Sequence, residues 1–380
     1  MATVPTLSGE HYLDDDLYRR EIDALFGNGW AFVGHQNSFP PGSKRAVELG
    51  GESVIISRDR NGSLRALANV CRHRGARLCP PTAPTDLAGQ AGPASIQCPY
   101  HSWTYSLDGS LVATPRVDPA EFNRADHGLW RYRLDTWNGL VFVSLGTPEP
   151  GTAASELATF LGRYSPGLVA FADMPVGDYH LGRRTFTSVE ANWKIIVENY
   201  LECLHCPTVH PELVDVVPLY RTGAVVDPTR TDGAVVLTGG GNSFSATAVT
   251  DLPRLPGFDP GATDLYRGSY VCPNLFVDVT STSFILTALF PEGPDRTLVM
   301  GEYLFAPDVA QNLDGAATGM GEIVEFSELV GRQDYEVCEL VQKGVSSRAF
   351  TTGILVDKDA EVVAFNRMYR EAMIALDGGA

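Results

Sequence analysis

The stretch CPYHSWTYSLDGSL, residues 98–111, holds a cysteine and a histidine with two residues between them, directly before a hairpin signal. An earlier stretch, CRHRGARL at 71–78, holds a second pair, with one residue between Cys71 and His73. The two pairs, C-x-H and C-x-x-H, are separated by 24 residues. Two thiols and two imidazoles suit either a tetrahedral zinc ion or a two-iron cluster. Because C-x-H is a poor zinc knuckle, the pattern favours the iron–sulfur cluster.

The segment around these pairs, residues 45–146, has the pattern of a β domain. Asn61-Gly62 separates two apolar runs and predicts a hairpin turn. Asp108-Gly109 predicts a second hairpin turn in the same way. LVFVSL (140–145) predicts a short buried strand, and TPEPG (147–151) a linker. Residues 11–33 predict an amphipathic helix that leads into a strand.

The second half of the chain mixes helix and strand signals, and 380 residues favour two domains. We expect a strand at 179–191, a helix at 192–206, several strands within 222–305 and two closing helices at 317–345 and 358–376. The segment 242–268 has few regular signals and predicts a mobile loop over a site.

A second cluster of metal-binding residue types is ENYLECLHCPTVHP, 198–211. His205 and His210 are five residues apart, roughly 140° around a regular helix, so an unbroken helix could not aim both at one metal. We expect Pro207 to end or kink the helix and let His210 swing back. Cys203 and Cys206 form a C-x-x-C without a second one, so we interpret them as small buried hydrophobic residues.

Together CRHRGARL, CPYHSWTYSLDGSL and ENYLECLHCPTVHP resemble the catalytic alpha subunit of the Rieske non-haem iron oxygenases, over nearly the whole chain. The resemblance implies an α+β fold with an N-terminal all-β Rieske [2Fe–2S] domain and a C-terminal catalytic domain with an antiparallel sheet of the helix-grip type. We expect an N-terminal helical segment packed on the catalytic domain at 1–39, the Rieske domain at 40–150 and the catalytic domain at 151–380. Compared with this family, residues 81–95 look like an inserted surface loop.

The resemblance also implies two sets of metal ligands. Cys71 and Cys98 would bind one iron of the cluster, and His73 and His101 the other. His205, His210 and a carboxylate far downstream would hold a mononuclear Fe(II) as a 2-His-1-carboxylate triad, which leaves positions for dioxygen and substrate. Asp334 matches this carboxylate, ahead of Gln342-Lys343-Gly344. The competing acids, which we interpret as solvated helix charges, are Glu328, Glu336 and Glu339, and Cys79 is interpreted as a free thiol.

Glu202 and Asn199 are the candidate catalytic residues beside this triad. In the family an acidic residue at the position of Glu202 links an iron ligand to a Rieske histidine of a neighbouring subunit, in a head-to-tail homotrimer. Orienting His205 is the simpler role, and bridging includes it. Glu rather than Asp here resembles the branch that acts on carnitine, glycine betaine and similar quaternary amines. Asn199 and Tyr200 either line the iron pocket or pack the helix.

The resemblance implies an oxygenase component that uses O2 to hydroxylate a small organic substrate. We expect electrons from NAD(P)H through a separate flavin/iron–sulfur reductase or a ferredoxin, because the chain has no dinucleotide fingerprint. The favoured reaction is monooxygenation or oxidative N-demethylation of a quaternary amine or betaine. Aromatic-ring hydroxylation or dioxygenation, O-demethylation, a non-catalytic Rieske electron-transfer or ligand-binding protein, and a zinc-structured binding protein remain as alternatives.

The residues that bind substrate are unknown from the sequence. A cation favours aromatic walls, and the candidates are Tyr266, Tyr270, Phe276 and Phe284. The arginines at 72, 74 and 77 either dock an acidic electron donor or brace the cluster loop.

The composition of the chain restricts which classes of binding partner and which cellular compartment we expect. A net charge of −17 argues against nucleic acid and anionic membranes as partners. The sequence has no apolar run of membrane-spanning length and no secretory signal pattern, so we expect a cytoplasmic protein. Seven cysteines, several beside histidines, indicate metal binding rather than a disulfide framework.

Overall fold

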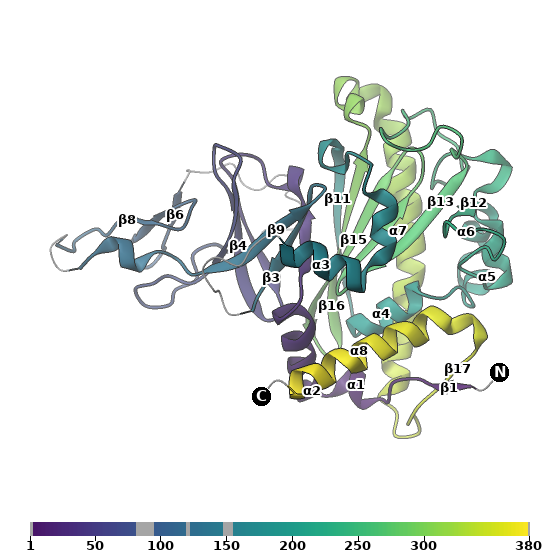
Figure 1. Cartoon of the computed structure of the whole chain (residues 1–380), viewed down its shortest axis with the longest axis horizontal. Helices are drawn as coiled ribbons and strands as arrows, with labels where there is room; N and C mark the ends of the chain where they lie inside the picture. The colour runs from purple at the N-terminus through teal and green to yellow at the C-terminus, as the bar shows by residue number, and fades with distance from the viewer. Residues whose placement is uncertain (1–2, 81–94, 119–121, 147–154, 379–380) are drawn as a thin grey trace.

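The computed structural model describes residues 3–80, 95–118, 122–146 and 155–378 (Figure 1). Two antiparallel six-stranded sheets dominate these residues. No helix in the described ranges is both long and apolar enough to cross a membrane. The predicted linker at 147–151 lies outside the described residues, as does the predicted insertion up to residue 94.

The first sheet has the strand order β2-β10-β9-β5-β4-β3. Its strands are β2 (Ala31–His35), β3 (Lys44–Leu49), β4 (Glu52–Arg58), β5 (Leu64–Ala68), β9 (Arg131–Trp137) and β10 (Leu140–Ser144). A smaller sheet joins β6 (Ser95–Gln97), β7 (Thr104–Ser106) and β8 (Leu111–Ala113). Both predicted hairpins are confirmed, and Gly62 and Gly109 take the positive φ angles, +90° and +87°, that these turns require.

The second sheet has the order β11-β16-β15-β14-β13-β12. Its strands are β11 (His180–Val189), β12 (Val235–Val236), β13 (Leu265–Val271), β14 (Leu275–Val279), β15 (Phe284–Gly293) and β16 (Arg296–Phe305). The predicted closing helices are confirmed as α7 (Leu313–Val345) and α8 (Ala360–Gly378). Helix α7 runs along this sheet and contacts both β11 and α4 (Trp193–Tyr200) (Figure 1). The predicted α+β class is therefore confirmed, with a β-rich first half and an antiparallel sheet with long helices in the second.

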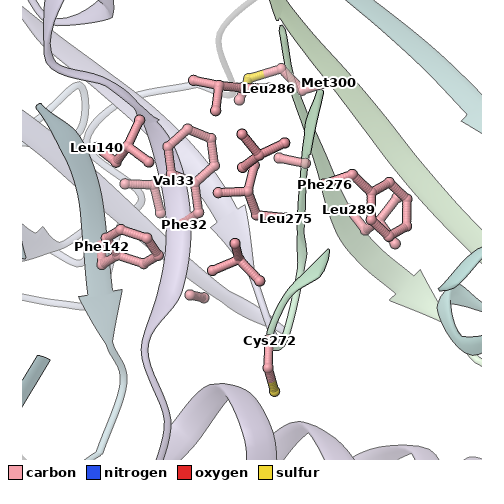
Figure 2. Close-up of a cluster of buried hydrophobic side chains, with 14 of the residues drawn as sticks. Phe32, Val33, Leu140, Phe142, Cys272, Leu275, Phe276, Leu286, Leu289 and Met300 are labelled. Atoms are coloured by element: carbon pink, nitrogen blue, oxygen red, sulfur yellow. The ribbon is translucent and has the colours of Figure 1, made fainter. Parts of the chain in front are cut away.

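An apolar core joins the two halves. Phe32 and Phe142 of the first sheet face Leu275 and Leu286 of the second, and all four are fully buried (Figure 2). The side-chain amide of Asn274 pairs with the backbone of Phe32 in both directions, at 2.9 and 3.0 Å, as a neighbouring strand would. The halves are thus fixed against each other by continuous packing and not by a few surface contacts.

The N-terminal segment packs on the second half through buried charges. Its elements are β1 (Val4–Pro5), which pairs with β17 (Ile354–Leu355), and the helical turns α1 (Glu10–Leu13), α2 (Asp15–Glu21) and η1 (Ile22–Gly27). Lys194 Nζ lies 2.7 and 2.6 Å from the two carboxylate oxygens of Glu21, and both side chains are fully buried. The hydroxyl of Tyr12 donates to Glu198. These contacts hold α4, which carries the start of the second metal-binding stretch.

The domain boundaries stay a proposal, with 40–150 and 151–380 as the two domains. Strand β2 lies within the segment 1–39 and is an edge strand of the first sheet. That segment therefore contributes to both halves.

The predicted helix at 192–206 is wrong in its second part. Helix α4 ends at Tyr200, and a short helix, α5 (Cys206–Val209), begins after His205. Pro207 starts this second helix instead of ending the first one, since it occupies the first turn, where its missing N–H costs nothing. A carboxylate oxygen of Glu202 accepts the backbone N–H of Leu204 and competes with the helical pattern there.

Candidate metal centres and catalytic cavity

Two loops of the first half share one hydrogen-bonding pattern. The N–H of Cys71 donates to the carbonyl of Ala76, five residues on, and the carbonyl of Cys71 accepts from Gly75. In the second loop, Cys98 makes the same two bonds with Trp103 and Ser102. Gly75 and Ser102, the fourth residues after the cysteines, both have positive φ, +73° and +59°. The C-x-H and C-x-x-H pairs therefore lie in two equivalent turns.

The two turns place the four predicted cluster ligands together. Cys71 and Cys98 are buried free thiols, whereas His73 is exposed and its ring centroid lies 4.7 Å from that of His101. Trp103 stacks on His73, with the ring planes 8° apart. Nδ1 of His101 is buried and has no hydrogen-bond partner among the residues that the structure describes. An orphaned imidazole nitrogen beside two buried thiols fits a metal bond, and thiols inside with imidazoles outside fits a cluster with two ligands on each iron.

The arginines around these turns brace the loops. Arg72 donates to the carbonyl of Gly128 and lies 4.0 Å above the ring of Trp130. Arg74 donates to the hydroxyl of Tyr100, and Arg77 is paired with Glu48 on the surface. The structure thus shows the bracing contacts, and docking of an electron donor stays a prediction. Cys79 is a buried free thiol, in agreement with its predicted role.

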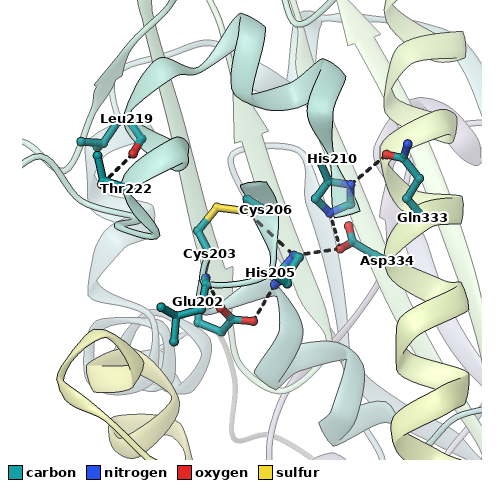
Figure 3. The surroundings of a disulfide bond; sticks show 10 residues. Glu202, Cys203, His205, Cys206, His210, Leu219, Thr222, Gln333 and Asp334 are labelled. Carbon is teal, nitrogen blue, oxygen red and sulfur yellow. Dashed lines mark hydrogen bonds and ion pairs between the residues drawn. A yellow bond between two sulfur atoms is a disulfide. The ribbon is translucent and has the colours of Figure 1, made fainter. Parts of the chain in front are cut away.

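The second predicted set of ligands also comes together, from three elements. His205 precedes α5, His210 separates α5 from α6 (Pro211–Val216), and Asp334 projects from α7 (Figure 3). Oδ1 of Asp334 lies 3.2 Å from Nε2 of His205 and 2.8 Å from Nε2 of His210. The three ligand atoms all lie within 4.8 Å of one another. The break in the helix between 200 and 206 is what turns both imidazoles to the same side.

Hydrogen bonds fix which nitrogen each imidazole presents. Nδ1 of His205 lies 2.5 Å from the carboxylate of Glu202, and Nδ1 of His210 lies 2.8 Å from Oε1 of Gln333. Since both partners are acceptors, each Nδ1 donates its proton to that partner and each Nε2 faces Asp334. Two bare Nε2 lone pairs would repel the carboxylate, so the site needs a cation there, either a proton on an imidazole or a metal ion, and the donor set fits a divalent metal held by a 2-His-1-carboxylate triad.

The pKa shifts of His205 and Asp334 agree with a site for positive charge. Burial alone would lower the pKa of His205, but hydrogen bonds with Asp334 and Glu202 raise it to about 9. Burial opposes ionisation of Asp334, yet the two histidines hold its pKa below the ordinary value. A proton therefore competes with metal for the same nitrogen, and metal affinity is expected to fall in acid.

The two cysteines of the stretch form a disulfide, Cys203–Cys206, beside His205 (Figure 3). Both are buried, as the interpretation of small buried hydrophobic residues expects, but the disulfide between them was not predicted. The three-residue spacing lies on a turn, with a Cα–Cα distance of 5.0 Å, and not on the continuous helix that the sequence suggests.

A cavity of about 940 Å³ adjoins the triad and is lined by residues of α4, α7 and the second sheet. Two aromatic stacks form part of its wall. Tyr200 stacks on Phe276 at 4.0 Å between centroids, and Tyr270 leans on Phe276. Phe244 stacks on Tyr266 at 5.3 Å, and Tyr220 meets Tyr266 edge-on. Of the four aromatic candidates from the sequence, Tyr266, Tyr270 and Phe276 line the cavity, whereas Phe284 is buried in the core.

Two half-buried carboxylates in the cavity wall were not predicted as site residues. Oδ1 of Asp278, on β14, accepts from the hydroxyls of Tyr200 at 2.8 Å and Tyr266 at 2.5 Å and so joins the two stacks. Burial raises the pKa of Asp278 to about 6, in part offset by these two bonds, so the group is mostly ionised at neutral pH. Oε1 of Glu328 accepts from Thr185 at 2.8 Å and Tyr303 at 2.9 Å.

Glu328 is therefore not the solvated helix charge that the sequence suggests. The other two competitors differ from it: Glu336 is exposed, and Glu339 accepts the backbone N–H of Glu190. None of the three joins the metal-binding group that the described residues form. Asn199 and Tyr200 line the cavity, the first of the two roles left open for them.

The sequence matches two families of known proteins. Residues 29–136 match the Rieske [2Fe-2S] domain. Residues 176–375, more than half of the chain, match the ring hydroxylating alpha subunit (catalytic domain). The chain is a Rieske non-haem iron oxygenase alpha subunit. This Rieske oxygenase is thus an enzyme whose two domains imply an iron–sulfur cluster and a mononuclear iron, and an oxygenase subunit implies a reductase partner.

Curated relatives of this Rieske oxygenase include two whose names specify a quaternary amine as substrate. The glycine betaine monooxygenase oxygenase subunit of Chromohalobacter salexigens is 28% identical, over 90% of this chain and 80% of the relative. The chloroplastic choline monooxygenase of Arabidopsis thaliana is also 28% identical, over 91% of this chain and 78% of the relative.

Solved structures show the same fold in enzymes with different substrates. A quaternary ammonium Rieske monooxygenase, described with carnitine oxidation and inter-subunit electron transfer, has a TM-score of 0.74 at 23% identity and covers 98% of this chain and 96% of its own. Naphthalene 1,2-dioxygenase from Rhodococcus sp. has a TM-score of 0.71 at 20% identity, covering 98% and 94%. The fold of the Rieske oxygenase alone therefore does not identify its substrate.

Replacement of Tyr105 by phenylalanine is expected to lower the reduction potential of the cluster. The hydroxyl of Tyr105 accepts from the N–H of Arg72 and lies 3.4 Å from Sγ of Cys71, to which it donates. A hydrogen bond to a ligand sulfur stabilises the reduced cluster, which is more negative than the oxidised one. Its loss destabilises the reduced cluster by about 1 kcal/mol, which lowers the reduction potential by an amount on the order of tens of millivolts. A redox titration followed by EPR measures this shift. Tyr132→Phe, on β9, is the control, and an unchanged potential in Tyr105→Phe would refute the role of this bond.

Proposed function

We propose that Cys71, Cys98, His73 and His101 hold the [2Fe–2S] cluster and that His205, His210 and Asp334 hold the mononuclear Fe(II). The buried thiols with the orphaned Nδ1 of His101 support the first assignment. The convergence of two Nε2 atoms on one carboxylate supports the second. Bound there, the iron ions would supply electron transfer and the activation of O2.

The two sites lie in opposite halves of one chain, which supports electron transfer between subunits. The small sheet next to Cys98 is at one end of the long axis, and α5 and α6 are at the other (Figure 1). We propose a head-to-tail homotrimer in which electrons from NAD(P)H, delivered by a flavin/iron–sulfur reductase or ferredoxin, cross to the neighbouring subunit. Glu202 is the proposed bridge, because its carboxylate already contacts His205 at 2.5 Å.

The proposed reaction is oxidative N-demethylation of a small quaternary or N-methylated amine. The observation that carries this proposal is the pair of aromatic stacks in the cavity, Tyr270–Phe276–Tyr200 and Phe244–Tyr266–Tyr220. Tyrosine and phenylalanine faces attract an ammonium group through their ring quadrupoles, and a desolvated site strengthens the attraction. The names of the relatives point to the same class of substrate.

The reaction balances with one O2, two electrons and two protons. One oxygen atom enters a C–H bond of an N-methyl group, and the other leaves as water. The N-hydroxymethyl product then breaks its C–N bond and gives formaldehyde and an amine with one methyl group fewer. The protein residues bind and orient the methyl group toward the triad and exclude water from the cavity.

Turnover with a surrogate reductase and NADH tests this proposal. A panel of N-methylated ammonium compounds, N-methyl prolines and aromatic acids is supplied, and oxygen uptake and formaldehyde are measured together. We expect formaldehyde in equal amount to the oxygen consumed with at least one N-methyl compound. Oxygen uptake with aromatic acids alone would overturn the proposal and favour ring hydroxylation.

A further inference from the structure

Acidic side chains outnumber basic side chains among the residues that line the cavity. Seven carboxylates line it, from Glu202, Asp278, Glu328, Asp334, Glu336, Glu339 and Glu361. Among the described lining residues the cationic side chains that are not metal-ligand candidates are Arg163 and Arg332, and both are largely exposed to solvent. A divalent iron would offset Asp334, but Asp278 and Glu328 remain as anionic groups of the wall.

Asp278 and Glu328 are built into the wall in the same way. Each carboxylate accepts two hydroxyl hydrogen bonds, and in the described structure neither is paired with a cationic side chain. Each group also lies over a glycine of the sheet. A Cβ at Gly268 would come within 2.8 Å of the Tyr200 hydroxyl, and a Cβ at Gly301 within 2.7 Å of Thr185 Oγ1. The two glycines thus leave room for the hydroxyl groups that bind these carboxylates. Both carboxylates line the cavity.

We propose that Asp278 and Glu328 determine the charge of the substrate: they select a cationic amine without a carboxylate, of the chemistry of choline, against a zwitterionic betaine. This inference rests on the proposed N-demethylation and narrows its substrate class. The cation of either compound gains from the two anionic groups and from the aromatic stacks. The carboxylate of a betaine must also leave water, and in this cavity it meets like charges and no buried arginine or lysine among the described lining residues.

A matched pair of ligands tests the selection directly. Choline and glycine betaine share a trimethylammonium group and differ in a hydroxymethyl against a carboxylate. Calorimetric titration of the iron-loaded enzyme is expected to give at least tenfold tighter binding for choline. Asp278→Asn, which keeps the shape and removes the charge, is expected to weaken choline binding at least tenfold and to change betaine binding little or improve it. Glu328→Gln is the second variant and should act in the same direction.

The controls separate charge selection from loss of structure. Glu325→Gln changes an exposed acid on α7 that does not line the cavity and should leave both affinities unchanged. Iron content and the Rieske EPR spectrum show that each variant is folded and loaded. Betaine binding as tight as choline would overturn the inference and leave the proposed function intact. A preference for choline that survives both substitutions would overturn the role of these two residues. Binding of neutral aromatic compounds and of neither ammonium compound would overturn the proposed function itself.

Discussion

Asp334→Ala is expected to abolish turnover, because it removes the carboxylate that both histidines contact. Oδ1 of Asp334 lies within 3.2 Å of both Nε2 atoms, and a triad that loses its anionic ligand loses most of its affinity for a divalent metal. We expect mononuclear iron to fall to near zero and formaldehyde production to fall by about 10³-fold or more. The Rieske EPR spectrum should stay unchanged, since the cluster site lies in the other half of the chain.

Glu325→Ala is the matched control for this experiment. It removes an exposed acid from the same helix, α7, outside the cavity. The control should retain iron and turnover. Retention of mononuclear iron by Asp334→Ala would reassign the third ligand, and loss of the Rieske signal as well would indicate misfolding instead.

The second large effect is expected from Glu202→Gln, which should slow electron delivery while both metals stay bound. Glu202 contacts Nδ1 of His205 and the N–H of Leu204, so glutamine retains an acceptor but loses the charge and the proton affinity. Substitution of such an outer partner typically lowers activity about 10- to 100-fold. Stopped-flow reoxidation of the reduced cluster by O2 in the presence of substrate measures the step.

Glu202→Asp distinguishes charge from reach in the same assay. It keeps the carboxylate on a side chain one methylene shorter, and we expect a rate between those of the glutamine variant and the unmodified enzyme. Reoxidation as fast in Glu202→Gln as in the unmodified enzyme would remove the bridging role and leave Glu202 as a partner that orients His205.

The cluster loops could be predicted from sequence because each turn carries its two ligands within four residues. Cys71 with His73 and Cys98 with His101 need only their local turns, which repeat one hydrogen-bonding pattern. Asp334 is more than a hundred residues from His210, and the resemblance alone singled it out from its neighbours. Its place beside the histidines depends on the packing of α4 against α7, which no local pattern encodes.

The carboxylates of the cavity wall could not be predicted for a related reason. Asp278 lies in an apolar strand, and its partners Tyr200 and Tyr266 come from a helix and another strand. Glu328 has the spacing of a solvated helix charge and is half-buried because Tyr303 and Thr185 of the sheet face it. The end of α4 at Tyr200 was missed because helical periodicity continues past it, while Glu202 caps the turn locally.

The central claim is that one chain carries both a Rieske cluster and a mononuclear iron site. Metal analysis of the purified protein, together with the EPR spectrum after reduction, tests it most directly. We predict a red-brown protein with about three iron atoms per chain, two in the cluster and one in the triad, and a Rieske signal in the reduced state. A colourless protein that contains zinc, or an iron protein without a Rieske signal on reduction, would contradict the account.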